Sequence, residues 1–420
     1  MEKKLYRYRK DSDVWMEAKI PLEYASCHDG IVVLSGTLPQ NPFNSGNGIT
    51  VPEEIDDIPV TELRATCRGV DNIDSAGLKR VNLKILSDSF DGEFYCVPPM
   101  LVGGMQDTIE EMRLVYEACD MRVGSFADME YLYSLSFNGV VHDNQDWDYG
   151  SFETGLFRNC TNLRNIHGIM KGYTLTGSTF RNCRSLETIP DLEITQMCDY
   201  EFENCSSLKN IHLHNGLTNV GYHCFANCTS LEDIYVPDTV KRIYEGAFLN
   251  CSNLETIHLP DSITEISREM FNGCVKLRKL FVPDMVESIG VKAFTGCVSL
   301  TDVFIPDGVK IINDEAFLAS GLQTIRTPSG LEKLGIRTFA ECTSLTKFFM
   351  PENISYIGDL CFEGCVALKS MKIPDKAIVG DQVFKGCAGL EKVELPIHLK
   401  HDDTVNKLGI AEETEVIWRD

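Results

Sequence analysis

Apolar and polar positions along the chain follow a pattern that repeats about every 23 residues and is clearest from residue 225 to 311. Each copy has a Phe, a Cys three residues later, a Leu, an apolar–x–apolar pair before Pro, and two more apolar residues. The Phe recurs eleven times, as Phe157, Phe180, Phe202, Phe225, Phe248, Phe271, Phe294, Phe317, Phe339, Phe362 and Phe384. One copy is too short to bury its own apolar face, so the pattern predicts stacked copies that share one core.

Each copy also predicts one short β-strand, because its apolar residues alternate. In one copy, Ile257 and Leu259 lie two residues apart and face the core, while His258 faces solvent. Pro260 lacks an amide donor, which suits the end of a strand. The next apolar residues return to the core from the opposite wall, and Phe271 fills the space between the walls. We therefore expect a β-rich solenoid, a right-handed coil with a continuous parallel sheet whose strands lie about 4.8 Å apart.

The repeat divides the chain into four parts. Short alternating apolar runs at 5–8, 15–20 and 31–34 predict an N-terminal β cap, which would cover the open end of the core. A closing strand is predicted at Thr414–Trp418. The parts are the N-terminal cap at 1–59, degenerate repeats at 60–156, the regular array at 157–396 and a C-terminal cap at 397–420.

Residues 84–125 interrupt the degenerate repeats. Asp107 and Glu110 have the spacing of a capping box, and they begin a run with apolar residues at helical spacing. These apolar residues are Ile109, Met112, Tyr116 and Cys119. The spacing predicts one short inserted helix.

An acidic loop at 142–148 raises the question of calcium. An EF-hand loop that began at Asp146 would need an oxygen ligand at its fifth position and Glu at its twelfth. Gly150 and Phe157 stand there instead. The sequence favours a solvated loop over a calcium site and predicts no metal.

The chain has 17 cysteines, and ten of them follow the repeat Phe by three residues. They are Cys160, Cys183, Cys205, Cys228, Cys251, Cys274, Cys297, Cys342, Cys365 and Cys387; Ser320 takes this place in the remaining copy. Such regular placement favours a buried packing site for a small thiol. Parallel side chains in a ladder suit disulfide geometry poorly. Disulfides and metal binding stay open as alternatives to buried free thiols.

The solvent side of the predicted strands carries a row of rings, which we call the aromatic stripe: Tyr235, His258, Phe281, Phe304 and Phe349. Stacked rings stabilise neighbouring strands. A contiguous exposed row of this kind also marks partner-binding surfaces. The two interpretations are compatible. The predicted partner-binding residues are His212, Tyr235, His258, Phe281, Phe304, Arg326, Phe349 and Lys372.

Basic residues gather toward the C-terminal end of this face, at Arg326, Lys347, Lys372 and Lys392. They predict that an acidic segment of the partner points toward that end.

The formal charge of −23 disfavours nucleic-acid binding, which needs a basic patch. Hydrophobic residues make up 43% and charged residues 24%, as in a soluble folded protein. No run of 18 apolar residues occurs, so no membrane span is predicted. The first twenty residues contain no apolar core of a signal peptide, which favours a cytoplasmic location. A monomer is expected.

No catalytic motif is present: neither Gly-x-Ser-x-Gly, His-Glu-x-x-His, Walker A nor Gly-x-Gly-x-x-Gly. His212 and His258 share a ladder position, but Tyr235 lies between them, so they are expected about 10 Å apart. This is too far for one metal ion. The sequence predicts a protein without enzymatic activity or cofactor. The alternatives are an enzyme whose site lies between the 84–125 insertion and the sheet edge, and a structural or adhesive stalk.

The repeat resembles the BspA-like leucine-rich repeat family over about residues 49–396. The family motif stands here as Ala293-Phe-Thr-Gly-Cys297, Leu300, Val303, Ile305-Pro-Asp307, Val309 and Ile312. The resemblance implies a leucine-rich repeat coil with its main sheet on the concave face. It also implies a non-catalytic recognition protein of bacterial surfaces that binds host or matrix proteins in adhesion. A surface or secreted location therefore stands beside the cytoplasmic one.

Overall fold

The computed structural model describes two compact units, one of Met1–Met197 and Glu201–His214, the other of Cys198–Tyr200 and Asn215–Asp420. Side chains are described at residues 127–134, 155, 157–167, 177–190, 192 and 194–419. The backbone is described there and at residues 2–10, 14–27, 30–34, 48–50, 54–55, 58–67, 72–74, 80–85, 89–90, 93–94, 111–116, 135–140, 168–171 and 193.

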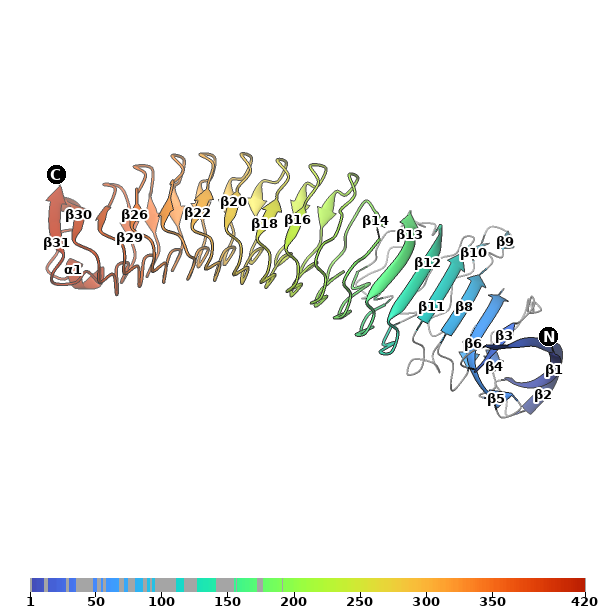
Figure 1. Cartoon of the computed structure of the whole chain (residues 1–420). Helices are drawn as coiled ribbons and strands as arrows, with labels where there is room; N and C mark the ends of the chain where they lie inside the picture. Colours follow the sequence, from blue (N-terminus) through green and yellow to red (C-terminus); the bar gives the residue numbers. More distant parts are fainter. Residues whose placement is uncertain are drawn as a thin grey trace. The chain divides into compact units, whose positions relative to one another are not determined.

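The first unit is built on one mixed sheet (Figure 1). It opens with the antiparallel strands β1 (Glu2–Lys10), β2 (Val14–Cys27) and β3 (Gly30–Leu34). These strands confirm the three that the alternating runs predicted. Parallel strands follow: β6 (Ile58–Cys67), β8 (Arg80–Ile85), β11 (Glu111–Tyr116), β12 (Ser134–Val140), β13 (Asn165–Lys171) and β14 (Leu192–Glu193). The short strands of this unit are β4 (Gly48–Thr50), β5 (Glu54–Ile55), β7 (Asn72–Asp74), β9 (Ser89–Phe90) and β10 (Glu93–Phe94).

The prediction of a helix in the 84–125 insertion is wrong at Glu111–Tyr116, which forms strand β11. This strand lies in the sheet, and Met112 pairs with Val81 of β8 and with Leu135 of β12. Met112 and Tyr116 fit a helical spacing, but Met112, Leu114 and Tyr116 also alternate as in a strand. Hydrogen bonds to β8 and β12 satisfy the backbone of β11 on both sides, and this pairing favours the strand over the helix. The predicted capping box and Cys119 lie outside the described residues.

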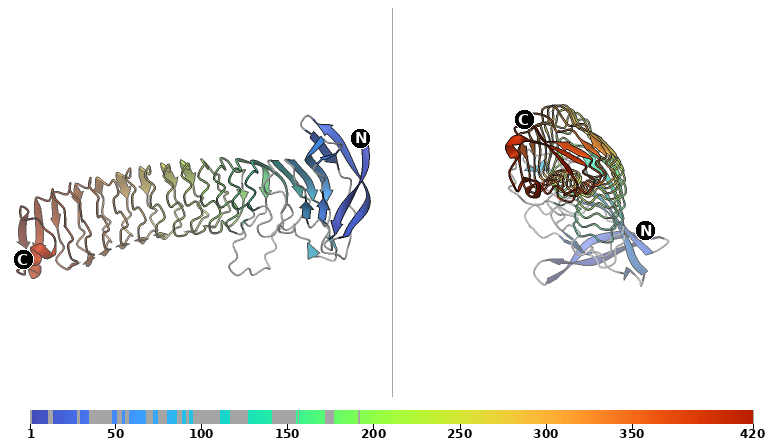
Figure 2. Two further views of the ribbon diagram at one scale, coloured as in Figure 1. Left: turned by 90° about the horizontal axis from the view of Figure 1, so that it is seen from below. Right: turned by 90° about the vertical axis from the view of Figure 1, so that its left-hand side faces the viewer.

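The second unit consists of stacked coils, each with strands on two walls (Figure 2). The main strands are β16 (Asp233–Tyr235), β18 (Thr256–His258), β20 (Lys279–Phe281), β22 (Asp302–Phe304), β24 (Thr324–Ile325), β26 (Lys347–Phe348), β28 (Ser370–Lys372) and β30 (Lys392–Pro396). The second wall holds β15 (Asn219–Val220), β17 (Arg242–Ile243), β19 (Glu265–Ile266), β21 (Ser288–Ile289), β23 (Ile311–Ile312), β25 (Lys333–Leu334), β27 (Tyr356–Ile357) and β29 (Ile378–Val379). All pair in parallel with the equivalent strand of a neighbouring coil, which confirms the predicted solenoid.

Hydrogen bonding is distributed unequally between the two walls. The second wall carries a six-stranded ladder from β19 to β29, whereas the main strands pair mostly two by two. A Pro follows most main strands, as Pro260 follows β18, and it removes a backbone donor. The main strands are short, and single backbone bonds beside them, such as Val236 N–H to His258 O and Val282 N–H to Phe304 O, join neighbouring coils.

The core is a column of Phe rings. All eleven repeat Phe side chains are buried, and the ring centroids of neighbouring coils in the same unit lie 5.0–6.1 Å apart in nearly parallel planes. Each ring is covered by the ring of the next coil, so burial requires neighbours.

The repeat cysteines do more than fill space. All cysteines with described side chains are free thiols. In eight coils the thiol donates to the Phe carbonyl of the coil before, as from Cys274 Sγ to Phe248 O at 3.1 Å. The same bond recurs at Cys183, Cys205, Cys251, Cys297, Cys342, Cys365 and Cys387. Burial raises the pKa of Cys251 to about 12, so the thiol keeps the proton that it donates.

Asn side chains connect the coils at a sharp corner two residues after the Phe. Asn227 and Asn250 adopt φ angles of 61° and 56°, in the left-handed region that Asn and Gly tolerate best. Asn250 Nδ2 donates to Asn227 Oδ1 at 2.9 Å. In the next coil Gly273, with φ 78°, takes this position.

The C-terminal end is closed by β31 (Glu415–Arg419), which pairs with β30 and confirms the predicted closing strand. The 3-10 helix η1 (Ile397–Leu399) and α1 (Thr404–Lys407) connect the two. Of the helices in the described ranges, none combines the length and apolarity of a membrane crossing.

Replacing Phe271 by Ala should lower the free energy of unfolding by about 3–5 kcal/mol, because a buried ring is lost from the column. Phe281→Ala is the matched control, since Phe281 lies in the same repeat copy but is 76% exposed. It should change stability by less than about 0.5 kcal/mol. Urea denaturation followed by circular dichroism measures both, and equal effects would show that Phe271 is not a core residue.

The repeat thiols should be free but protected. In the native protein an alkylating reagent should label the half-buried Cys198 before the buried repeat cysteines. In denaturant, without reductant, mass spectrometry should find all repeat thiols labelled. Recovery of these cysteines as disulfide-linked peptides would contradict the structure.

Candidate binding surface

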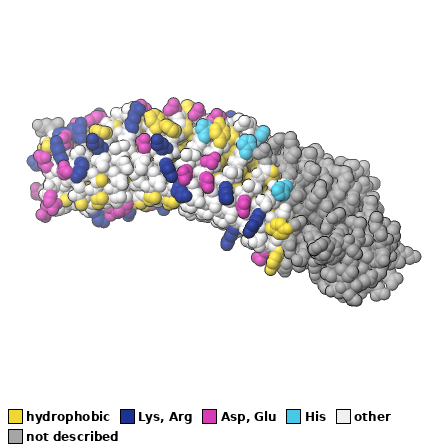
Figure 3. Space-filling view, viewed as in Figure 1, with side chains coloured by type: hydrophobic (Ala, Val, Ile, Leu, Met, Phe, Trp, Pro, Cys, Tyr) yellow, Lys and Arg dark blue, Asp and Glu magenta, His cyan; other side chains and the backbone are white. Residues whose placement is uncertain are grey.

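The main strands place the aromatic stripe on the outer face of the second unit. In β16, β20 and β22 the middle residue is buried and its two neighbours are exposed. Tyr235, Phe281 and Phe304 therefore face solvent, as the alternation predicts. Hydrophobic and His side chains gather along this part of the surface (Figure 3).

The rings of the stripe are not equivalent. Tyr235 and His258 stack with centroids 4.4 Å apart and planes 4° apart. Phe304 is covered by the guanidinium of Arg326, which lies 5.6 Å from the ring centroid. Phe281 and Phe349 are 76% and 72% exposed, and no ring or cation of the described residues covers them. Stacking explains one end of the stripe, and the open Phe rings offer apolar surface.

His212, the first predicted binding residue, is also exposed, but it belongs to the first unit. The other predicted residues, Tyr235 to Lys372, are exposed on the second unit. The structure thus brings together seven of the eight on one face.

A column of carboxylates runs beside the stripe, directly after the Pro that ends each main strand. We call Asp238, Asp261, Asp284, Asp307, Glu352 and Asp375 the acidic column; all six are exposed. Their pairing with the next coil was not predicted from the sequence. The signal was their constant place three residues after each stripe position.

Three members of the acidic column pair with a basic residue of the next coil that occupies the strand position of the aromatic stripe. Arg326 Nη2 lies 3.5 Å from Asp307 Oδ2, and Lys372 Nζ lies 2.5 Å from Glu352 Oε1. His258 Nε2 lies 3.3 Å from Asp238 Oδ1, a hydrogen bond that becomes an ion pair when the imidazole is protonated. The backbone N–H of Ser329 donates to Asp307, and this bond, with a smaller contribution from Arg326, lowers the pKa of that carboxyl.

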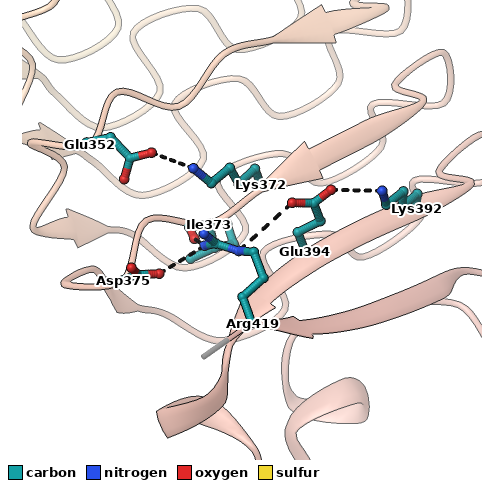
Figure 4. Close-up of polar contacts among 7 residues, drawn as sticks. All are labelled: Glu352, Lys372, Ile373, Asp375, Lys392, Glu394 and Arg419. Carbon is teal, nitrogen blue, oxygen red and sulfur yellow. Dashed lines mark hydrogen bonds and ion pairs between the residues drawn. The ribbon is translucent and has the colours of Figure 1, made fainter.

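At the C-terminal end of the acidic column, two carboxylates of neighbouring coils share one arginine (Figure 4). Asp375 is followed at the stripe position by Glu394 instead of a cation. Arg419 of β31 lies between them, with Nη2 3.1 Å from Asp375 and Nε 3.9 Å from Glu394, and it also donates to the carbonyl of Ile373. Lys392 lies 2.8 Å from Glu394; its hydrogen bond, with Arg419 and Lys372 adding less, lowers the pKa of Glu394.

Most of the basic residues that the sequence offered to an acidic partner are therefore engaged within the chain. Arg326, Lys372 and Lys392 each face a carboxylate. For Lys347, no described carboxylate lies within ion-pair distance. Little positive charge is therefore left on this face to attract the acidic partner segment that the sequence predicted.

Candidate chemistry is sparse in the part of the chain that the structure describes. No group of three His, Cys, Asp or Glu residues there is placed to hold a metal ion. The acidic loop at 142–148 lies outside the described residues, as does most of the 84–125 insertion. The solvated loop at 142–148 and the alternative enzyme site at the insertion therefore stay predictions from the sequence.

Comparison with known proteins identifies the repeat. The family model for the BspA type leucine rich repeat region matches in six copies, at residues 129–191, 146–237, 178–299 and 264–391. None of the curated proteins matches the chain.

Solved structures that resemble the chain are bacterial leucine-rich repeat proteins. A leucine-rich repeat protein from Bacteroides ovatus is 18% identical with a TM-score of 0.34, over 95% of this chain and 98% of the other. A leucine rich cell surface protein from Faecalibacterium prausnitzii is 19% identical with a TM-score of 0.40, over 99% and 95%. The leucine rich repeat protein of T. pallidum is 20% identical with a TM-score of 0.30, over 66% and 87%. The family matches cover more than half of the sequence, and the chain belongs to the BspA-type leucine-rich repeat proteins.

Proposed function

We propose that the chain is a non-catalytic binding protein whose main-strand face receives a protein or peptide partner. The observation that carries the proposal is the exposure of Phe281 and Phe349, at 76% and 72%, on the same face as Phe304. Phe304 lies beside Phe281, and Arg326 stands between Phe304 and Phe349. Single exposed rings need no explanation, but a row of them is typical of an interface.

The open rings are poorly explained by sheet stability alone. A ring that only supports its strand stacks on the next, as Tyr235 does on His258. Phe281 lies in register with Phe304, yet three quarters of it stays in water. Burying such a ring against a partner would remove about 150 Å² of surface from water. At about 25 cal/mol per Å², that is a few kcal/mol per ring.

The dimensions of the row suit a short extended segment. Phe281 and Phe349 are three strands apart, which corresponds to about 14 Å. An extended chain covers this length in about four residues. Aromatic residues at the centre of a contact tend to contribute most of its energy. Adhesion to a host or matrix protein is the form of this function that the family resemblance favours, and monomeric action fits it.

Changing Phe281 to Ser together with Phe304 to Ser should weaken partner binding by more than about tenfold, because the central rings are lost. Proteins captured from bacterial lysate and from host extracellular matrix are compared between the wild type and the variant, and the affinity of each captured protein is then measured.

Val275→Ser with Val298→Ser is the matched control, since these exposed apolar residues lie in neighbouring coils away from the stripe. Circular dichroism establishes that each variant is folded. Equal affinities for the stripe variant and the control would mean that the rings serve the sheet only.

A further inference from the structure

A ring, a carboxylate and a cation recur together along the main-strand face. In one coil Phe304 and Asp307 lie three residues apart, and Arg326 of the next coil contacts both, 5.6 Å from the ring centroid and 3.5 Å from the carboxylate. Lys372 likewise pairs with Glu352, three residues after Phe349.

The coil of Tyr235 follows the same rule. Asp238 lies three residues after Tyr235, and His258 of the next coil stacks on the ring and bonds the carboxylate. Two coils therefore hold a basic side chain, supplied by the next coil, against both a ring and a carboxylate. In a third, Lys372 pairs with the carboxylate of Glu352 while the Phe349 ring stays exposed.

One coil has the ring and the carboxylate without the cation. Phe281 and Asp284 stand in the usual places, but the next coil supplies Phe304 where others supply His, Arg or Lys. Asp261 also lacks a cation from the next coil, because Phe281 takes the outer strand position there. Among the described residues, no cationic group lies within ion-pair distance of Asp261 or Asp284. Two neighbouring carboxylates thus flank the most exposed ring of the stripe.

We propose that a Lys or Arg side chain of a basic partner segment occupies this place, against Phe281 and between Asp261 and Asp284. The proposal rests on the binding function proposed above and specifies its partner. Long basic side chains present an apolar stem to a ring and a charge to carboxylates. A cation over a ring gains further from the π electrons. The chain itself uses this arrangement at Phe304, Asp307 and Arg326.

The surrounding charge agrees with a basic partner. At the other end of the same strands Lys279 lies in register with Asp302, so these two charges offset each other. The whole chain carries a formal charge of −23, which attracts basic segments over longer distances.

The test uses the full chain and four fluorescein-labelled peptides of one length, in which Leu alternates with Arg, Lys, Gln or Glu. Fluorescence anisotropy should show tightest binding for the Arg and Lys peptides and weakest for the Glu peptide. The preference should shrink at high salt, because exposed charge pairs are screened. Asp261→Asn with Asp284→Asn should weaken binding of the Arg peptide by about three- to tenfold, the effect of two exposed pairs.

Glu412→Gln with Glu413→Gln removes the same net charge at exposed positions outside the stripe and is the matched control. Equal affinity for the Arg and Gln peptides would overturn the proposal, as would equal effects of the Asp variant and the control. If only the Phe281→Ser, Phe304→Ser variant weakens all peptides alike, the surface stands and the basic partner is wrong. If neither variant affects a bound peptide, both proposals fall.

Discussion

The structure depends on one constraint: no coil can bury its own Phe ring. Each ring is covered by the rings of the coils beside it, about 5–6 Å away. Hydrogen bonds between neighbours add to this, from the buried thiol of Cys297 to the carbonyl of Phe271 and, at the surface, from the side-chain amide of Asn250 to that of Asn227. Stability is therefore a sum over adjacent pairs, and the interior of every coil must match that of the next.

The same constraint leaves the outer face free to vary. A main strand must place one apolar residue inward, while the residue beside it meets only solvent and its neighbours. The outer position holds Tyr, His, Phe, Arg, Lys and Glu in successive coils. The order of these outer residues decides which side chains meet between one coil and the next, as Arg326 meets Asp307.

Features that recur in every coil could be predicted from the sequence. The period, the Phe column and the capping strands could be read from single residues, since each position has the same surroundings in every coil. Three features required contacts that a pattern does not contain. Met112 and Tyr116 fit both a helix and a strand, and only pairing of β11 with β8 and β12 decides. The thiols were recognised as small side chains, but not as donors. Arg326 was recognised as basic, but its carboxylate lies in the preceding coil.

The position of Arg419 has a consequence for how such an array can change its length. A coil duplicated in the middle brings its own outer residue and its own carboxylate, so each new junction can repeat an existing one. The last coil differs, because Asp375 and Glu394 depend on a guanidinium that belongs to the closing strand. A copy of the coil of Glu394 placed before the cap would separate Asp375 from Arg419. New coils therefore leave the contacts of Arg419 intact only where they enter upstream of Asp375.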